Sequence, residues 1–103
     1  MTTTRGEAAA RIEREIVAEK AAALGRAGER LHDALAEVAR LAGALDATTE
    51  PAARAGLGRA YEQAWRCAAR ARLALLIQRE AVGVRQHQLV DQQFPEPPRR
   101  RPP

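Results

Sequence analysis

An apolar residue recurs every seven positions through the first half of the chain, and this heptad spacing constrains the fold more than any other feature. The members of the series are Ala10, Val17, Leu24, Leu31, Val38 and Leu45. Two turns of an α-helix contain about seven residues, so this spacing places the side chains in one stripe along a helix. We therefore predict a long helix over residues 7–45 with a single apolar stripe, which Leu35 widens.

The second half of the chain repeats the pattern with a second apolar series. Its members are Tyr61, Ala68, Leu75, Val82 and Leu89. The same spacing predicts a second helix over residues 51–92. A break at 46–50 separates the two helices. The hydroxyl of Thr48 or Thr49 can cap a helix N-terminus, and Pro51 is tolerated in a first turn, where its missing N–H is not needed.

So short a break requires the two helices to run antiparallel. We therefore predict an all-α fold, an antiparallel two-helix hairpin of the coiled-coil type, spanning residues 5–93. Packing one stripe against the other forms the core. The core residues that we predict are Leu24, Leu31, Val38, Leu75 and Val82.

The second helix has another apolar face, on the side away from the first helix. We predict that this face is a dimer interface formed by Ala69, Leu73, Leu76, Ile77, Gly83 and Val84. The chain is 46% hydrophobic but only 3% aromatic, and alanine buries little area, so a lone hairpin would have a thin core. The expected assembly is a homodimeric four-helix bundle, in which Gly83 permits a close approach of the helix backbones.

The last ten residues, 94–103, are rich in proline and arginine. Proline favours an extended conformation, so we predict a disordered tail. Arg99, Arg100 and Arg101 are candidates for nucleic-acid binding, because flexible basic arms neutralise phosphates without reading sequence. A solubilising tail explains the same residues, and a GC-rich genome also produces an excess of arginine. The net charge is only +4 and aromatic residues are few, so we expect weak, non-specific binding at most.

No arrangement of residues in the sequence indicates catalysis. The pattern contains no paired carboxylates, no nucleophile–base pair and no phosphate-binding loop. Cys67, the only cysteine, stands among alanines, where a thiol behaves as a small hydrophobe. Glu29 and His32 have the spacing of di-iron ligands but point away from the Leu31 stripe. We therefore predict a protein that is not an enzyme and that has no catalytic residues, metal or cofactor.

Trp65, Arg79 and His87 are the candidates for binding a protein partner. Tryptophan is enriched at binding hot spots, and packing in the core or in a dimer is the alternative interpretation of Trp65. The longest apolar run, Leu73–Ile77, is too short to cross a bilayer, and the first residues show no apolar secretory segment. We expect a cytoplasmic protein that does not bind membranes.

Two stretches of the sequence resemble a known group of proteins. Residues 19–28 read Glu-Lys-Ala-Ala-Ala-Leu-Gly-Arg-Ala-Gly, residues 78–85 read Gln-Arg-Glu-Ala-Val-Gly-Val-Arg, and Trp65 lies between them. Over residues 12–92 this combination resembles a group of short, uncharacterised bacterial helical-hairpin proteins. The resemblance implies a helical hairpin and transfers no activity to this chain.

These features favour a non-catalytic interaction or scaffold protein that acts through self-association and a protein partner. The alternative is a nucleic-acid-associated accessory protein that uses the arginine-rich tail.

Overall fold

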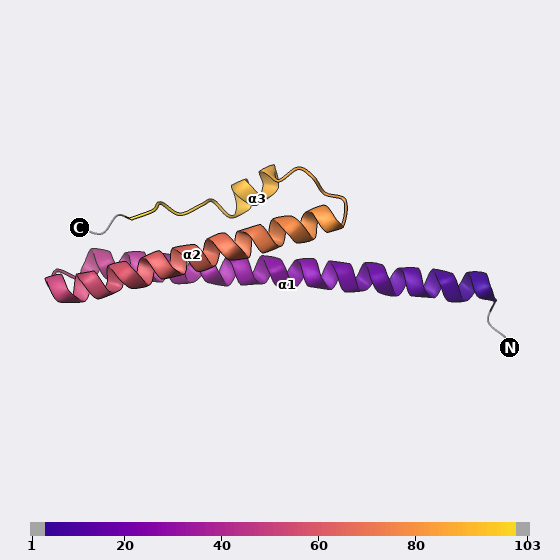
Figure 1. Cartoon of the computed structure of the whole chain (residues 1–103), viewed down its shortest axis with the longest axis horizontal. Coiled ribbons are helices and arrows are strands. Elements are labelled where there is room, and N and C mark those ends of the chain that lie inside the picture. The colour runs from indigo at the N-terminus through magenta and orange to yellow at the C-terminus, as the bar shows by residue number, and fades with distance from the viewer. Residues whose placement is uncertain (1–3, 101–103) are drawn as a thin grey trace.

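A computed structural model of the protein describes residues 4–100 (Figure 1). Its helices are α1, Arg5–Ala47, α2, Pro51–Ala81, and the short α3, Gln88–Gln93. The two long helices pack side by side as an antiparallel hairpin, and the described part of the chain contains no strand. The molecule is a rod of 73 × 27 × 15 Å. The predicted all-α hairpin is therefore confirmed.

The closed end of the hairpin is held by side chains that satisfy the ends of both helices. Arg54 donates from Nη1 to the carbonyl oxygens of Leu45 and Thr48, at 2.5 and 2.7 Å, at the C-terminal end of α1, where carbonyls lack partners in a following turn of helix. Glu50 caps α2, because its carboxylate accepts the backbone N–H groups of Ala52 and Ala53 at 3.0 and 2.7 Å. These N–H groups hold the pKa of Glu50 below its usual value.

The prediction that Thr48 or Thr49 caps the second helix was therefore wrong. Thr48 is instead the C-cap of α1, and Glu50 takes the capping position beside Pro51. A carboxylate caps as well as a hydroxyl when it can reach two N–H groups, and its charge also suits the positive end of the helix dipole.

Two clusters of buried side chains form the core. The cluster near the closed end contains Val38, Leu41, Leu45, Tyr61, Ala64 and Ala68. The cluster further along contains Ala27, Leu31, Leu75 and Val90. Of the predicted core residues, Leu31, Val38 and Leu75 are buried and Leu24 is half-buried, whereas Val82 is exposed and its assignment was wrong.

The second helix ends at Ala81, eleven residues before the predicted end at 92, because the chain forms a helix-ending turn at Gly83. Gly83 has φ +91°, its N–H donates to the carbonyl of Glu80 at 3.0 Å, and the N–H of Val84 donates to the carbonyl of Arg79 at 2.9 Å. This pair of bonds is a Schellman motif, which glycine favours since it has no Cβ to clash at positive φ. Gly83 therefore ends a helix, and within residues 4–100 no atom beyond its chain neighbours lies within 4 Å of a Cβ placed on it.

This conformation gives a prediction for glycine-to-alanine substitutions. Gly83→Ala is expected to lower the free energy of unfolding by about 1–2 kcal/mol, because alanine is strained at positive φ. Gly43→Ala is the matched control: Gly43 lies inside α1 with open space around a Cβ, so alanine should stabilise the helix by about 1 kcal/mol. Urea denaturation of both variants measures the two shifts. If both substitutions changed the free energy of unfolding in the same direction, the assignment of Gly83 to a helix-ending turn would be contradicted.

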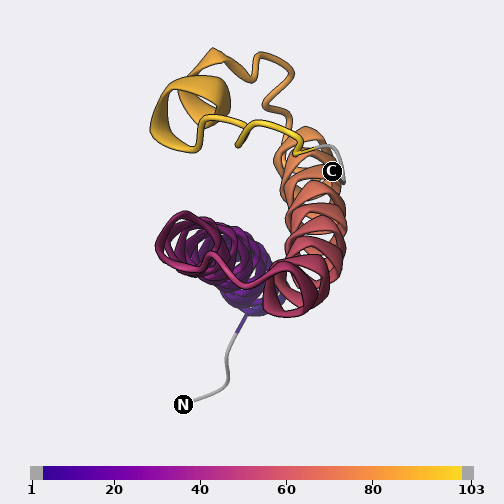
Figure 2. The ribbon, with the colours of Figure 1, turned by 90° about the vertical axis from the view of Figure 1, so that its left-hand side faces the viewer.

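After α2 the chain doubles back over the hairpin, and we call residues 88–100 the return segment. It lies on one side of the two long helices, so that α1, α2 and the return segment occupy the corners of a triangle (Figure 2). Val90 is buried in the second cluster, and Phe94 packs against the same cluster. Residues 95–100 form neither helix nor strand, and the carbonyl oxygens of Pro97 and Pro98 accept hydrogen bonds from side chains of α2.

Candidate interaction surfaces

The first candidate surface is the N-terminal part of α1, which extends beyond the end of α2 (Figure 1). The helix α1 has 43 residues and α2 has 31, and every residue from 11 to 22 is exposed. We call residues 5–22 the overhang. At 1.5 Å per residue it is about 27 Å long. Its exposure means that α2 does not cover it.

The overhang continues the apolar stripe that packs on α2 further along α1. Ile12, Ile16 and Val17 are exposed to 56%, 45% and 66%, although large aliphatic side chains are usually buried. Glu13 and Lys20 interrupt this stripe seven residues apart, so they occupy equivalent positions on the helix. The overhang therefore presents an apolar stripe that carries one negative and one positive side chain.

A second exposed apolar face lies on α2, where the sequence predicted the dimer interface. Leu73 and Ile77 are exposed to 58% and 56%, and Val84 to 37%. Ala69 and Leu76 are half-buried, Leu76 against the core of its own chain. With Gly83 in the helix-ending turn, two of the six predicted interface positions, Leu76 and Gly83, contribute to the fold of the single chain.

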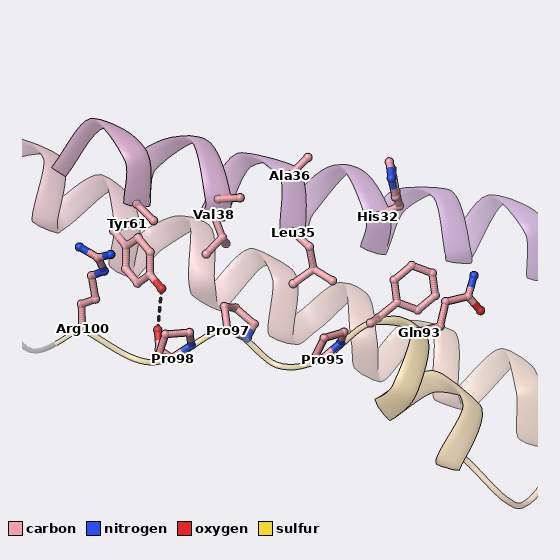
Figure 3. Close-up of a pocket in the computed structure, with 13 residues that line it drawn as sticks. His32, Leu35, Ala36, Val38, Tyr61, Gln93, Pro95, Pro97, Pro98 and Arg100 are labelled. Atoms are coloured by element: carbon pink, nitrogen blue, oxygen red, sulfur yellow. Dashed lines mark hydrogen bonds between the residues drawn. The ribbon is translucent and has the colours of Figure 1, made fainter. Parts of the chain in front are cut away.

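A third candidate surface, which we call the tail site, is formed by Asp46, Tyr61, Glu62 and Trp65 and is covered by residues 97–100. The hydroxyl of Tyr61 donates to the carbonyl of Pro98 at 2.5 Å (Figure 3). The indole Nε1 of Trp65 donates to the carbonyl of Pro97 at 3.0 Å. Two consecutive carbonyl oxygens of the tail thus meet two donors that lie one helical turn apart on α2.

Two of the tail arginines add charge contacts to the tail site. Arg99 lies over the Trp65 ring at 4.6 Å and donates to Glu62 at 2.6 Å. Arg100 lies over the Tyr61 ring at 5.3 Å and donates to Asp46 at 3.2 Å. The hydrogen bond from Arg99 is the main cause of a lowered pKa of Glu62, and the same pair raises the pKa of Arg99. Both arginines are therefore engaged within the chain.

A groove of about 560 Å³ runs beside the docked tail, between the return segment and α1 (Figure 3). Its walls include His32, Leu35 and Ala39 on α1, and Phe94, Pro95 and Arg100 on the return segment. The lining is mainly apolar and includes Val38 of α1 and Tyr61 of α2. Part of the hairpin surface next to the docked tail is therefore not covered by it.

The remaining candidate residues of the sequence serve the turn and the return segment. Arg79 donates to the carbonyl of Gln86 at 3.0 Å, and Nδ1 of His87 lies 3.4 Å from its Nε. His87 also lies 3.1 Å from Glu80 through Nε2. These contacts tie α2 to the chain that follows it. Arg101, the third nucleic-acid candidate, lies outside the described residues.

Trp65 and the tail arginines were predicted as separate candidates, and the sequence pattern does not show that they meet. It also missed Arg72, which donates to the carbonyl of Phe94 and lies 3.5 Å from Asp91, fixing the return segment on α2. Cys67, expected among packed alanines, is exposed on α2. An available signal was the pairing of Tyr61 with Trp65 four residues later, since an aromatic pair on one helix face suits a proline-rich segment.

The comparisons with known proteins return no family. No family model, curated protein or solved structure matches this chain. Within residues 4–100, no helix is long and apolar enough to cross a membrane, and no group of three or more His, Cys, Asp or Glu residues is placed to hold a metal ion. The interpretation of function therefore depends on the surfaces described above.

The ion pair of Glu62 gives a prediction for the effect of pH on the docked tail. Because the folded-state pKa of Glu62 is lowered, the pair stabilises docking above the unfolded carboxylate pKa and is lost as the pH falls through the folded value. Docking should be constant from about pH 8 to pH 5 and weaken below about pH 4. The fluorescence of Trp65, the only tryptophan, reports this change directly. Glu62→Gln, which does not titrate, should weaken docking above about pH 5 to the level that the parent reaches in acid, and should reduce the acid transition.

Proposed function

We propose that this protein is a non-catalytic helical interaction protein that acts by pairing with a second copy of itself. The proposal depends on the overhang, because nothing within residues 4–100 covers its apolar stripe. A stripe of this kind, in continuation of a core, marks an interaction surface. A second copy is the simplest cover, because two identical surfaces close on each other around a two-fold axis without forming an open-ended assembly.

The charges on the overhang define how two copies would pair. An antiparallel pair with its two-fold axis between Ile16 and Val17 sets Glu13 of each copy beside Lys20 of the other. The same arrangement places Ile16 against Val17 of the second copy, at the centre of the contact. The two polar interruptions of the stripe are thereby paired, which avoids the penalty for burying a lone charge.

This pairing uses only the part of α1 that α2 leaves exposed. The exposed run of α1 ends at residue 22, and Leu24 already packs against the second core cluster. An overhang laid antiparallel on another therefore covers residues that α2 does not reach. The resulting dimer is elongated, with the two closed ends pointing away from each other. The side-by-side four-helix bundle expected from the sequence would instead use Leu73 and Ile77.

Sedimentation equilibrium of the full chain tests the proposal. At tens of micromolar the protein should have twice its chain mass of 11.2 kDa, and the dimer should dissociate on dilution. A protein that keeps the mass of one folded chain over this concentration range would contradict self-association.

The nucleic-acid alternative has less support. Arg99 and Arg100 are already paired with Glu62 and Asp46, so binding a phosphate would require these ion pairs to break. The cytoplasmic location, a protein partner and the lack of enzymatic activity stay predictions of the sequence.

A further inference from the structure

The contacts at the tail site are those by which proteins recognise proline-rich peptides. An extended proline-rich segment has no internal hydrogen bonds, so its carbonyl oxygens are available to donors on another surface. Recognition surfaces for such segments are lined by aromatic side chains. Here Tyr61 and Trp65 supply the rings, and each also donates one hydrogen bond, to the carbonyls of Pro98 and Pro97.

We propose that the tail site is a binding site for an extended Pro-Pro-Arg-Arg segment, that the chain's own residues 97–100 occupy it as an internal ligand, and that a segment of this chemistry from another protein competes for it. The proposal goes beyond self-association and is independent of it, because it uses the surface of α2 near the closed end and leaves the overhang untouched.

The charged residues make the site selective for arginine after the prolines. Glu62 accepts from Arg99 and Asp46 accepts from Arg100, while each guanidinium also lies over one of the two rings. A planar guanidinium can stack on a ring and donate to a carboxylate at the same time. A proline-rich segment without arginine would contact only the rings of Tyr61 and Trp65 and their two hydrogen-bond donors.

The competing segment is assigned to another protein because the tail of a second copy is poorly placed. Residues 97–100 lie near the closed end of the hairpin, whereas the overhang is at the opposite end of the rod (Figure 1). In the proposed dimer the two tail sites are therefore far apart. The tail of the same chain is tethered by a short connection, which gives it a high effective concentration at its own site.

The test uses a dansyl-labelled peptide of sequence Phe-Pro-Glu-Pro-Pro-Arg-Arg. Energy transfer from Trp65, the only tryptophan of the chain, measures its binding whether or not the tail is displaced. One protein is the unmodified full chain. The other is the full chain carrying Arg99→Glu and Arg100→Glu, in which like charges face Glu62 and Asp46 and release the tail. The released variant is expected to bind the peptide at least about tenfold more tightly, because the internal competitor is gone.

Two sets of controls define the chemistry. Peptides with the two adjacent prolines replaced by alanine, or with both arginines replaced by glutamate, should bind at least about tenfold more weakly than the parent peptide. In the protein, Tyr61→Phe keeps the ring and removes only the hydroxyl that donates to Pro98. In the released background it should weaken peptide binding by roughly fivefold, the value of one hydrogen bond.

Three results would overturn the proposal. The first is a released variant with intact helices, by circular dichroism, that does not bind the peptide. The second is equal binding of the parent and the proline-free peptides. The third, which decides if the released variant does not fold, is equal energy transfer from the unmodified chain to the parent peptide and to the peptide with both arginines replaced by glutamate, each at millimolar concentration.

Discussion

Replacing Leu31 by alanine is expected to lower the free energy of unfolding by about 2–4 kcal/mol, the usual range for a leucine removed from a packed core. Leu31 is 0% exposed and lies with Ala27, Leu75 and Val90 in the second core cluster. Its side chain joins three elements, because Ala27 is on α1, Leu75 on α2 and Val90 on α3. No neighbour can fill the space without moving one of these elements.

Urea denaturation measured by circular dichroism tests this loss. Leu89→Ala is the matched control, since Leu89 is next to Val90 but is 67% exposed, and its truncation should change stability by less than about 0.5 kcal/mol. A loss below about 0.5 kcal/mol for Leu31→Ala would mean that the return segment and the hairpin do not share a core.

The second large effect is expected from Ile16→Glu, which should raise the dissociation constant of the dimer by at least about a hundredfold. In the proposed pair Ile16 of both copies lies beside the two-fold axis, so one substitution introduces two carboxylates into the centre of the contact. Burying charges without partners carries a large desolvation penalty. Sedimentation equilibrium should show single chains at concentrations where the parent is a dimer.

The control for this variant is the same substitution at the other exposed apolar face. Ile77→Glu replaces a side chain of similar exposure, 56% against 45% for Ile16, and should leave the dimer intact. Dissociation by Ile77→Glu alone, with Ile16→Glu still dimeric, would contradict pairing through the overhang and favour the four-helix bundle around α2.

A charge exchange tests the antiparallel register. Glu13→Lys sets two lysines side by side in each half of the contact, and Lys20→Glu does the same with two glutamates. Each single variant should weaken the dimer, and the double variant should recover most of the loss, because it restores opposite charges. If the double variant lost as much dimer affinity as a single variant, or the sum of both losses, Glu13 and Lys20 would not be in contact across the dimer.

The long helices could be predicted because their signal is local and repeated. Each member of the heptad series, from Leu24 to Leu45, falls on one face of α1. Because the period is set by many positions, one residue that departs from the pattern does not hide it. The closed end was also predictable in position, since Pro51 can only begin a helix there. The capping residue was not, because Thr48, Thr49 and Glu50 all carry acceptors within reach.

The end of α2 was missed because Val82 and Leu89 continue the heptad spacing beyond Ala81. The competing signal was Gly83, which ends helices more often than it lies inside them. Of the apolar residues after Gly83 and before Phe94, only Val90 is buried, and it returns to the core on α3 beside Ala27, Leu31 and Leu75. The seven-residue spacing alone therefore cannot show whether the apolar residues continue along one helix or lie on a chain that turns back over the hairpin.

The tail site could not be predicted because its acceptors are backbone carbonyls, which every residue has. The hydrogen bonds from Tyr61 and Trp65 span 37 and 32 residues of sequence, and only the turn at Gly83 brings their partners into range. Composition indicated an extended tail, but the surface that the tail meets depends on where α2 ends.

Small-angle X-ray scattering of the unmodified chain at tens of micromolar tests the pairing most directly, because it measures mass and length together. A single chain is 73 Å long. Pairing through the overhangs places each closed end roughly 55 Å from the two-fold axis, so we predict twice the chain mass and a maximum dimension of roughly 110 Å. A dimer little longer than 73 Å, or a particle with the mass of one chain, would contradict it.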